Sequence, residues 1–148
     1  MLQNSMLPIT VVPSLPAASL KEIKHLCAAL TGVAREIQID IVDGKYVPHT
    51  SWPFTERNPM KAFGKMQKYT KNFLLEVDCM VQEPLQYLDE IVKLQPRRVC
   101  IHVGSTQDYD AIIAHGLRYG YQVGFAFTND TPLDILDMYI DDIAYVQL

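Results

Sequence analysis

The chain has 148 residues, a length that suits one domain, and its 49% hydrophobic and 20% charged residues are typical of a globular protein and exclude a disordered one. A formal charge of −4 at pH 7 excludes the broad basic surface that nucleic acid binding requires, although a local site can still bind a small anion. No stretch approaches the ~18 apolar residues of a membrane span, and "MLQNSMLPIT" is not a signal-peptide pattern, so we expect a cytoplasmic protein with no membrane partner.

The N-terminal third is predicted to form a strand, a helix and a second strand. The apolar run "LPITVV" (7–12), ended by Pro13, predicts a short first strand. A helix follows it, opened by a capping box in which Ser19 stands three residues before Glu22. In "EIQIDIV" (36–42) isoleucine occupies every second position, which is the pattern of a strand with one apolar face.

The rest of the chain repeats this order of helix and strand. Four further strands are predicted from short apolar runs, at 73–81, 98–103, 121–127 and 143–148. The helices between them are predicted to begin at capping residues or prolines, namely Asn58 with Pro59, Pro84, Ser105 with Asp108, and Thr131 with Pro132 and Asp134. Such alternation predicts a parallel sheet with right-handed crossovers, either a doubly wound sheet or a (β/α) barrel.

Two sequence features refine this prediction. No G-x-G-x-x-G or Walker A stretch follows the first strand, which removes the strongest sign of a nucleotide-binding doubly wound fold. The three cysteines, Cys27, Cys79 and Cys100, lie in apolar segments and lack C-x-x-C spacing. We therefore expect three reduced, buried thiols.

Polar side chains share one face of several predicted strands. Gln38 and Asp40 alternate with isoleucines on the second strand, Asp78 lies in the middle of the third, and His102 is on the fourth. In a barrel the apolar face of each strand packs on helices, so these polar groups would converge inside, near the carboxyl ends of the strands. Two alternatives stay open: Asp40 and Asp43 as strand-end aspartates that bind loop amides, and His102 as a hydrogen-bonded core histidine.

Five segments together resemble a known family. They are "VPSL" (12–15), "DIVDGKYVP" (40–48), "VDCMVQEPLQYL" (77–88), "IHVGS" (101–105) and "GFAFTNDTPLDIL" (124–136). In this order, and over nearly the whole chain, they are similar to the landmarks of ribulose-phosphate 3-epimerases. The resemblance implies a TIM barrel and an isomerase of carbohydrate metabolism that inverts C3 of a ketopentose phosphate. In that family two aspartates act on opposite faces of the sugar, through an enediolate held by a divalent metal.

The resemblance also implies roles for individual residues. Asp40 matches the aspartate that serves as catalytic base and metal ligand. A carboxylate suits this role, because the proton next to a ketone is weakly acidic and needs a base to remove it. Ser14 matches a substrate-contacting serine, and Met80 matches a methionine that lines the pocket. His102, from its expected place at the mouth of the barrel, is a further candidate for substrate binding.

The metal ligands are where the chain departs from the family pattern. Gln38 and Asp78 stand where the family places two metal-binding histidines. With Asp40 they would form an oxygen-rich set that suits Mg²⁺ or Mn²⁺ better than Zn²⁺. The loss of both histidines favours an alternative hypothesis, a non-catalytic barrel relative that binds a sugar phosphate or a partner.

Length is the second departure. A full barrel takes ~250 residues, and the sequence reaches its last residue at the sixth predicted strand. We therefore expect an incomplete TIM barrel, one partial domain over residues 1–148 that lacks the last two βα units, with six parallel strands and five intervening helices. The open edges of such an arc would favour association into a homo-oligomer. We also expect the chain by itself to be inactive as an epimerase.

Overall fold

A computed structural model describes residues 9–148, and one six-stranded parallel sheet organises them. The strands are β1 (Ser14–Leu15), β2 (Glu36–Val42), β3 (Leu74–Met80), β4 (Arg98–His102), β5 (Gln122–Ala126) and β6 (Tyr145–Gln147). They pair in chain order, β1-β2-β3-β4-β5-β6, and every pair is parallel. A doubly wound sheet reverses its strand order at one point, so this order is that of a (β/α) barrel wall.

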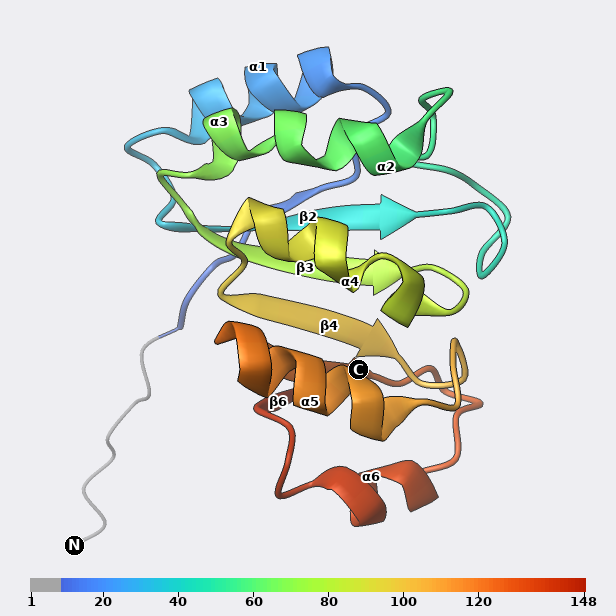
Figure 1. Cartoon of the computed structure of the whole chain (residues 1–148). Coiled ribbons are helices and arrows are strands. Elements are labelled where there is room, and N and C mark those ends of the chain that lie inside the picture. Colours follow the sequence, from blue (N-terminus) through green and yellow to red (C-terminus); the bar gives the residue numbers. More distant parts are fainter. Residues whose placement is uncertain (1–8) are drawn as a thin grey trace, which may run out of the picture.

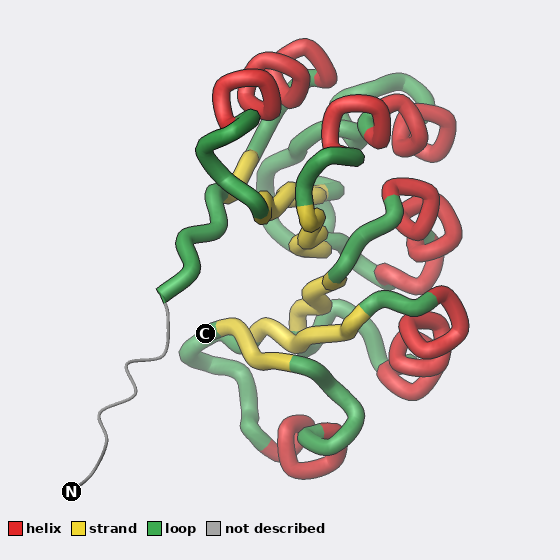
Figure 2. The backbone as a smooth tube through the Cα atoms, turned by 90° about the vertical axis from the view of Figure 1, so that its left-hand side faces the viewer, coloured by secondary structure: helices red, strands yellow, loops and turns green. Residues whose placement is uncertain are grey.

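Helical segments fill all five connections between successive strands. They are α1 (Leu20–Leu30); α2 (Pro59–Ala62), η1 (Phe63–Lys65) and α3 (Gln67–Thr70); η2 (Pro84–Gln86), α4 (Leu88–Ile91) and η3 (Val92–Leu94); α5 (Tyr109–Tyr119); and α6 (Asp134–Tyr139). They lie along one face of the sheet (Figure 1), and the strands curve into an arc inside the helices, open on the side where the C-terminus lies (Figure 2). None of the helices within residues 9–148 is long and apolar enough to cross a membrane. The expected partial barrel of six strands and five helical connections is confirmed.

The first strand was wrongly predicted. Residues 7 and 8 lie outside the described residues, and residues 9–12 form no strand; β1 instead follows Pro13. Pairing with β2 explains the shift, since the Pro13 carbonyl accepts a hydrogen bond from the Gln38 amide at 2.8 Å and Ser14 is in register with Gln38. Ile9 is 90% exposed, so β-branched residues there have no neighbour to pack against.

Two of the predicted helix starts are confirmed by their caps. The Ser19 hydroxyl accepts a hydrogen bond from the Glu22 amide at 3.2 Å, directly before α1. The Asn58 side chain accepts one from the Lys61 amide at 3.3 Å, and Pro59 is the first residue of α2. In both cases the local sequence pattern was sufficient, because the capping side chain and its partner are three residues apart.

The other two predicted caps are wrong. The cap predicted at Ser105 does not form, since α5 begins only at Tyr109 and Ser105 is buried. Helix α6 begins at Asp134, while the Thr131 hydroxyl instead accepts a hydrogen bond from the Thr128 amide at 3.0 Å. Short polar side chains can bind their own loop as readily as a helix end, and here the loop competes successfully.

The alternation of apolar and polar residues is confirmed in β2. Ile37, Ile39 and Ile41 are buried in the main hydrophobic core, while Gln38 and Asp40 occupy the alternate positions and are only partly buried. The same phase continues through the neighbouring strands, whose core residues include Leu75, Val77, Val99, Ile101 and Phe125. The apolar core therefore lies between sheet and helices, which leaves the concave face for polar groups. All three cysteines are buried and free, as expected.

Close contact between β5 and β6 depends on Gly124. The two strands pair with Gly124 opposite Tyr145, and a Cβ atom added to Gly124 would lie 2.3 Å from the tyrosine ring. The Arg98 guanidinium lies 5.4 Å from the centroid of the same ring. An absent side chain on β5 thus gives the Tyr145 ring its place beside the polar face of β4.

Gly124→Ala should therefore destabilise the protein, by about 1–3 kcal/mol in the free energy of unfolding, because the new methyl group overpacks the Tyr145 ring. Gly64→Ala is the matched control, since an added Cβ there has no neighbour within 4 Å. We expect the control to change stability by less than about 1 kcal/mol. Urea unfolding of both variants measures the difference, and equal stabilities would contradict the packing assigned to Gly124.

Candidate functional site

The polar residues of the concave face form one group, which we call the inner cup. It consists of Ser14, Gln38, Asp40, Glu76, Asp78, His102 and Gln147. Asp40 on β2 is in register with Asp78 on β3. The carboxylate of Asp40 accepts a hydrogen bond from Ser14 Oγ at 2.7 Å, and Asp78 Oδ1 lies 2.8 Å from His102 Nε2.

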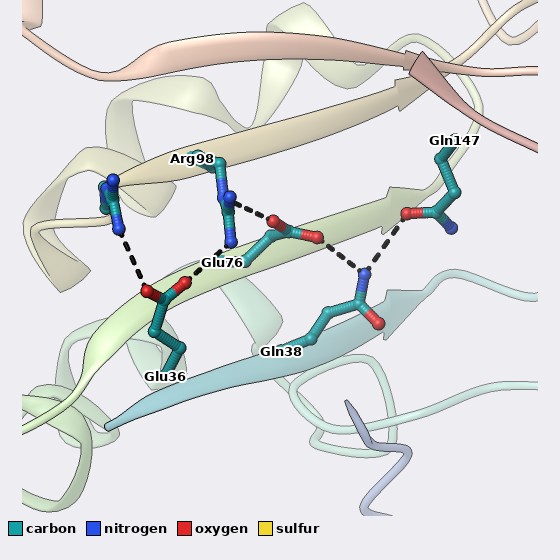
Figure 3. A network of polar contacts seen from close by, with 6 residues as sticks. Glu36, Gln38, Glu76, Arg98 and Gln147 are labelled. Atoms are coloured by element: carbon teal, nitrogen blue, oxygen red, sulfur yellow. Dashed lines mark hydrogen bonds and ion pairs between the residues drawn. The ribbon is translucent and has the colours of Figure 1, made fainter. Parts of the chain in front are cut away.

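An amide bridge connects Gln38 to the Asp78–His102 pair. Gln38 Nε2 donates to Glu76 Oε1 at 2.8 Å and to Gln147 Oε1 at 3.3 Å (Figure 3). Gln147 Nε2 in turn donates to Asp78 Oδ2 at 3.2 Å. The structure therefore brings together the four polar residues expected to converge. Gln147 connects Gln38 to the Asp78–His102 pair, and Asp40 is the register neighbour of Asp78.

Ion pairs lie on the same face, toward the amino ends of the strands. Arg98 Nε is 2.6 Å from Glu76 Oε2, and Arg98 Nη2 is 2.9 Å from Glu36 Oε2 (Figure 3). Arg97 Nη1 adds a contact of 3.1 Å to Glu36 Oε1. Two arginines thus offset the two glutamates, which is the pairing that buried carboxylates require.

Sequence reasoning missed Gln147 in the inner cup and Arg98, which pairs with Glu76 of the cup. A signal existed for Arg98, because it is two and four residues before Cys100 and His102 and so shares their face of β4. Gln147 shares its face with Tyr145 on β6. No local pattern, however, indicates that its side chain meets Gln38, which is 109 positions away in the sequence.

Asp40 is the carboxylate of the cup that keeps a free oxygen. Its Oδ1 atom is buried and has no hydrogen-bond partner within the described part of the chain, whereas Oδ2 is bound by Ser14. Burial raises the pKa of Asp40 above its ordinary value, and the hydrogen bond from Ser14 partly opposes this. The negative charge of Asp78 raises the pKa further, while His102 lowers it.

Contacts at the end of β2 show which of Asp40 and Asp43 is a strand-end aspartate that binds loop amides. Asp43 Oδ1 accepts hydrogen bonds from the amides of Lys45 at 2.8 Å and Tyr46 at 3.1 Å, and Asp43 Oδ2 accepts one from Gln82 at 3.0 Å. Asp43 is therefore a strand-end aspartate that binds loop amides. Asp40 makes none of these contacts; its partner is Ser14.

The mouth of the cup is lined by aromatic and apolar groups. The ring centroids of Tyr46 and His102 are 5.4 Å apart, and the Tyr46 hydroxyl donates a hydrogen bond of 3.4 Å to the Val103 carbonyl. Met80 is the last residue of β3 and is half-buried, two positions beyond Asp78 on the same face. His102 is hydrogen-bonded to Asp78, the register neighbour of Asp40, and its ring lies beside that of Tyr46.

The expected metal ligands do not fit a divalent ion in this arrangement. Within residues 9–148 no three His, Cys, Asp or Glu side chains gather where they could hold one. Both oxygens of Asp78 accept hydrogen bonds or ion-pair contacts, and Gln38 turns its amide nitrogen toward Glu76 and Gln147. A hard cation needs several oxygens directed at one point, whereas of the three expected ligands only Asp40 keeps a free oxygen.

Comparison with known proteins gives a consistent result. A model of the ribulose-phosphate 3 epimerase family matches residues 10–148. The ribulose-phosphate 3-epimerase of Chlamydia pneumoniae is 27% identical over 104 residues, covering 70% of this chain and 42% of the relative. That of Schizosaccharomyces pombe is 23% identical over 144 residues, covering 95% and 60%. The chain spans about half the length of the curated relatives it matches.

Solved structures support the fold alone. The 3-keto-L-gulonate-6-phosphate decarboxylase of Vibrio cholerae is similar with a TM-score of 0.68 at 10% sequence identity, covering 93% of this chain and 60% of that one. A putative lyase/mutase from Burkholderia cenocepacia has a TM-score of 0.59 at 14% identity, covering 96% and 55%. These likenesses extend over nearly all of this chain and agree with a partial (β/α) barrel.

The ion pair between Glu76 and Arg98 should be coupled. Glu76→Gln or Arg98→Met alone should cost about 2–3 kcal/mol in the free energy of unfolding, because each leaves a charged partner poorly compensated. The double variant should cost clearly less than the sum of the two single variants. Glu90→Gln is the control, since Glu90 pairs with the exposed Lys93 on the surface and should cost less than about 0.5 kcal/mol. Strictly additive costs at Glu76 and Arg98, measured by urea unfolding, would contradict the pairing.

Proposed function

The chain belongs to the ribulose-phosphate 3 epimerase family, and from that premise we propose that the inner cup binds a ketopentose phosphate and removes the proton from its C3 carbon. The proposed reaction class is isomerisation of a phosphorylated sugar. Asp40 is the proposed base. Ser14, Met80 and His102 are the proposed substrate contacts.

The observation that carries this proposal is the free oxygen of Asp40. Asp78 and Glu76 use their carboxylates on partners from the chain itself, whereas Asp40 Oδ1 is buried without one. A base works best when its pKa lies near the working pH, and burial moves the pKa of Asp40 upward, toward that range. The hydrogen bond from Ser14 occupies Oδ2, so Oδ1 is the oxygen proposed to take the proton.

His102 is proposed to contact an oxygen of the sugar. Asp78 binds the ring at Nε2, which orients the imidazole and leaves Nδ1 for a ligand. With Nε2–H donating to Asp78, Nδ1 donates only in the protonated imidazolium form; in that form it would stabilise the negative charge that develops on the carbonyl oxygen when the C3 proton leaves. Met80 would contact the carbon chain of the sugar, since it ends the strand that carries Asp78.

Inversion needs a second acid on the opposite face of the sugar. Asp40 supplies only one side, so we propose that these 148 residues exchange the C3 proton with solvent without inverting the centre. Any epimerase activity of a longer protein would depend on groups beyond this cup.

One observation favours a second candidate, a non-catalytic relative that binds the sugar phosphate. By the resemblance, Gln38 and Asp78 stand where the family carries metal-binding histidines, and here both are engaged in bonds within the cup. The two candidates differ in one observable, which is exchange of the C3 proton. Binding without exchange would favour the second.

Asp40→Asn should lower the rate of C3 proton exchange by about 10²–10⁴-fold, because the variant keeps the shape of the side chain but removes the base. The measurement is loss of the C3 proton signal of ribulose 5-phosphate in D₂O, followed by NMR. Asp137→Asn, an exposed position on α6, is the control and should exchange at the wild-type rate. Equal rates for wild type and Asp40→Asn would contradict the role of Asp40.

The same variant tests the charge state of Asp40 through stability. Since the folded state raises the pKa of Asp40, ionisation of this group opposes folding once the pH rises above the ordinary value of about 3.9. Asp40→Asn should therefore raise the Tm at pH 7, by about 2–4 °C, and the gain should vanish below about pH 4. Thermal unfolding of both proteins at pH 3.5 and pH 7 measures this difference. An Asp40→Asn variant that is less stable than wild type at pH 7 but not at pH 3.5 would contradict the raised pKa.

A further inference from the structure

We infer that Gln147 takes the place of a divalent cation in the inner cup and holds Gln38 and Asp78 in an arrangement that needs no metal. Gln147 is then a positioning residue, because it acts on the cup through its two neighbours. The inference concerns the same cup as the proposed function and rests on that proposal only in treating the cup as a substrate site. Its geometric basis is independent of any substrate.

The position of the Gln147 side chain supports this assignment. β6 is the last strand of the sheet, separated from β2 by three other strands in the sheet order, and the two lie across the arc from each other (Figure 2). From β6 the Gln147 amide spans this interior: Nε2 donates to Asp78 Oδ2 at 3.2 Å, and Oε1 accepts from Gln38 Nε2 at 3.3 Å. One side chain thus joins the two positions at which the family pattern has metal-binding histidines.

Polar groups on four strands are connected by a continuous series of contacts. Arg98 pairs with Glu76, Glu76 accepts from Gln38, and Gln147 links Gln38 to Asp78, whose other oxygen contacts His102. Each carboxylate in this series meets an N–H group. In a partly enclosed site such a network of contacts is stabilising, and breaking one link leaves a polar group without its partner.

The groups that surround Asp78 oppose the entry of a cation. To reach Asp78, a divalent ion would have to displace the Gln147 amide from Oδ2 and the His102 ring from Oδ1. The amide nitrogens of Gln38 and Gln147 present the positive ends of their dipoles inside the same space. The Gln147 amide and the His102 ring therefore occupy the two Asp78 oxygens that a metal would otherwise bind, and the amide adds no charge.

A single substitution tests this assignment. Gln147→Glu replaces the amide donor by a second carboxylate beside Asp78, which creates an oxygen-rich pair suited to Mn²⁺. Gln122→Glu is the matched control, because it makes the same chemical change at an exposed position opposite Arg98 in the register of β4 and β5. The full chain is used throughout. Mn²⁺ binding is measured by electron paramagnetic resonance, and thermal unfolding is followed in EDTA and in 1 mM Mn²⁺.

For wild type and Gln122→Glu we expect no bound Mn²⁺ and a Tm that changes by less than about 1 °C between EDTA and Mn²⁺. Gln147→Glu should unfold at lower temperature than wild type in EDTA and should gain about 3–6 °C in Mn²⁺. Stoichiometric Mn²⁺ binding by wild type would overturn the inference, and so would a Gln147→Glu variant as stable as wild type in EDTA. If that variant does not fold, Gln147→Met serves in its place; it should lose stability without gaining Mn²⁺ binding, and unchanged stability would overturn the inference.

These outcomes are separable from those of the proposed function. None of the measurements contains a sugar, so a failure to bind or exchange ribulose 5-phosphate leaves them intact. Conversely, stoichiometric Mn²⁺ binding by wild type would overturn the role of Gln147 while leaving Asp40 as the proposed base.

Discussion

The desolvation of carboxylates on the concave face is the constraint on which the candidate site depends. Four acidic side chains, Glu36, Asp40, Glu76 and Asp78, lie on that face of β2 and β3. Two arginines, two glutamine amides and one imidazole bind three of them, while Asp40 has only the hydroxyl of Ser14. Glu36, Glu76 and Asp78 therefore belong to a structural network, whereas Asp40 is the candidate reactive group. A carboxylate with a free, buried oxygen is the natural candidate for proton transfer.

Much of this arrangement could be predicted from the sequence, because it follows from short-range rules. The period of two in "EIQIDIV" assigned Ile37 and Asp40 to opposite faces, and the residues around Ser19 and Asn58 located two helix starts. The alternation of strands and helices predicted the partial barrel that the strand order then confirmed. Each of these features is decided within a few residues of chain.

The rest could not be predicted, because it depends on distant contacts or on competition between local ones. The first strand forms where Pro13 and Ser14 meet β2, and not where the apolar run lies. Ser105 and Thr131 have the residue types of helix caps, yet Thr131 binds its own loop and Ser105 is buried ahead of α5. Gln147 acquires its role from partners on the opposite side of the arc. A resemblance to a family could assign Asp40 its place, but not identify the side chain that occupies the space between Gln38 and Asp78.

Asp40 differs from its acidic neighbours because one of its carboxylate oxygens is buried without a hydrogen-bond partner within residues 9–148. The most direct test is a carboxyl ¹³C NMR titration of the intact chain, with the Asp40 resonance assigned by its loss in Asp40→Asn. The account predicts that this carboxyl titrates above the ordinary aspartate value of about 3.9. A midpoint at or below that value would mean that the group is well solvated or well paired, and would contradict the account.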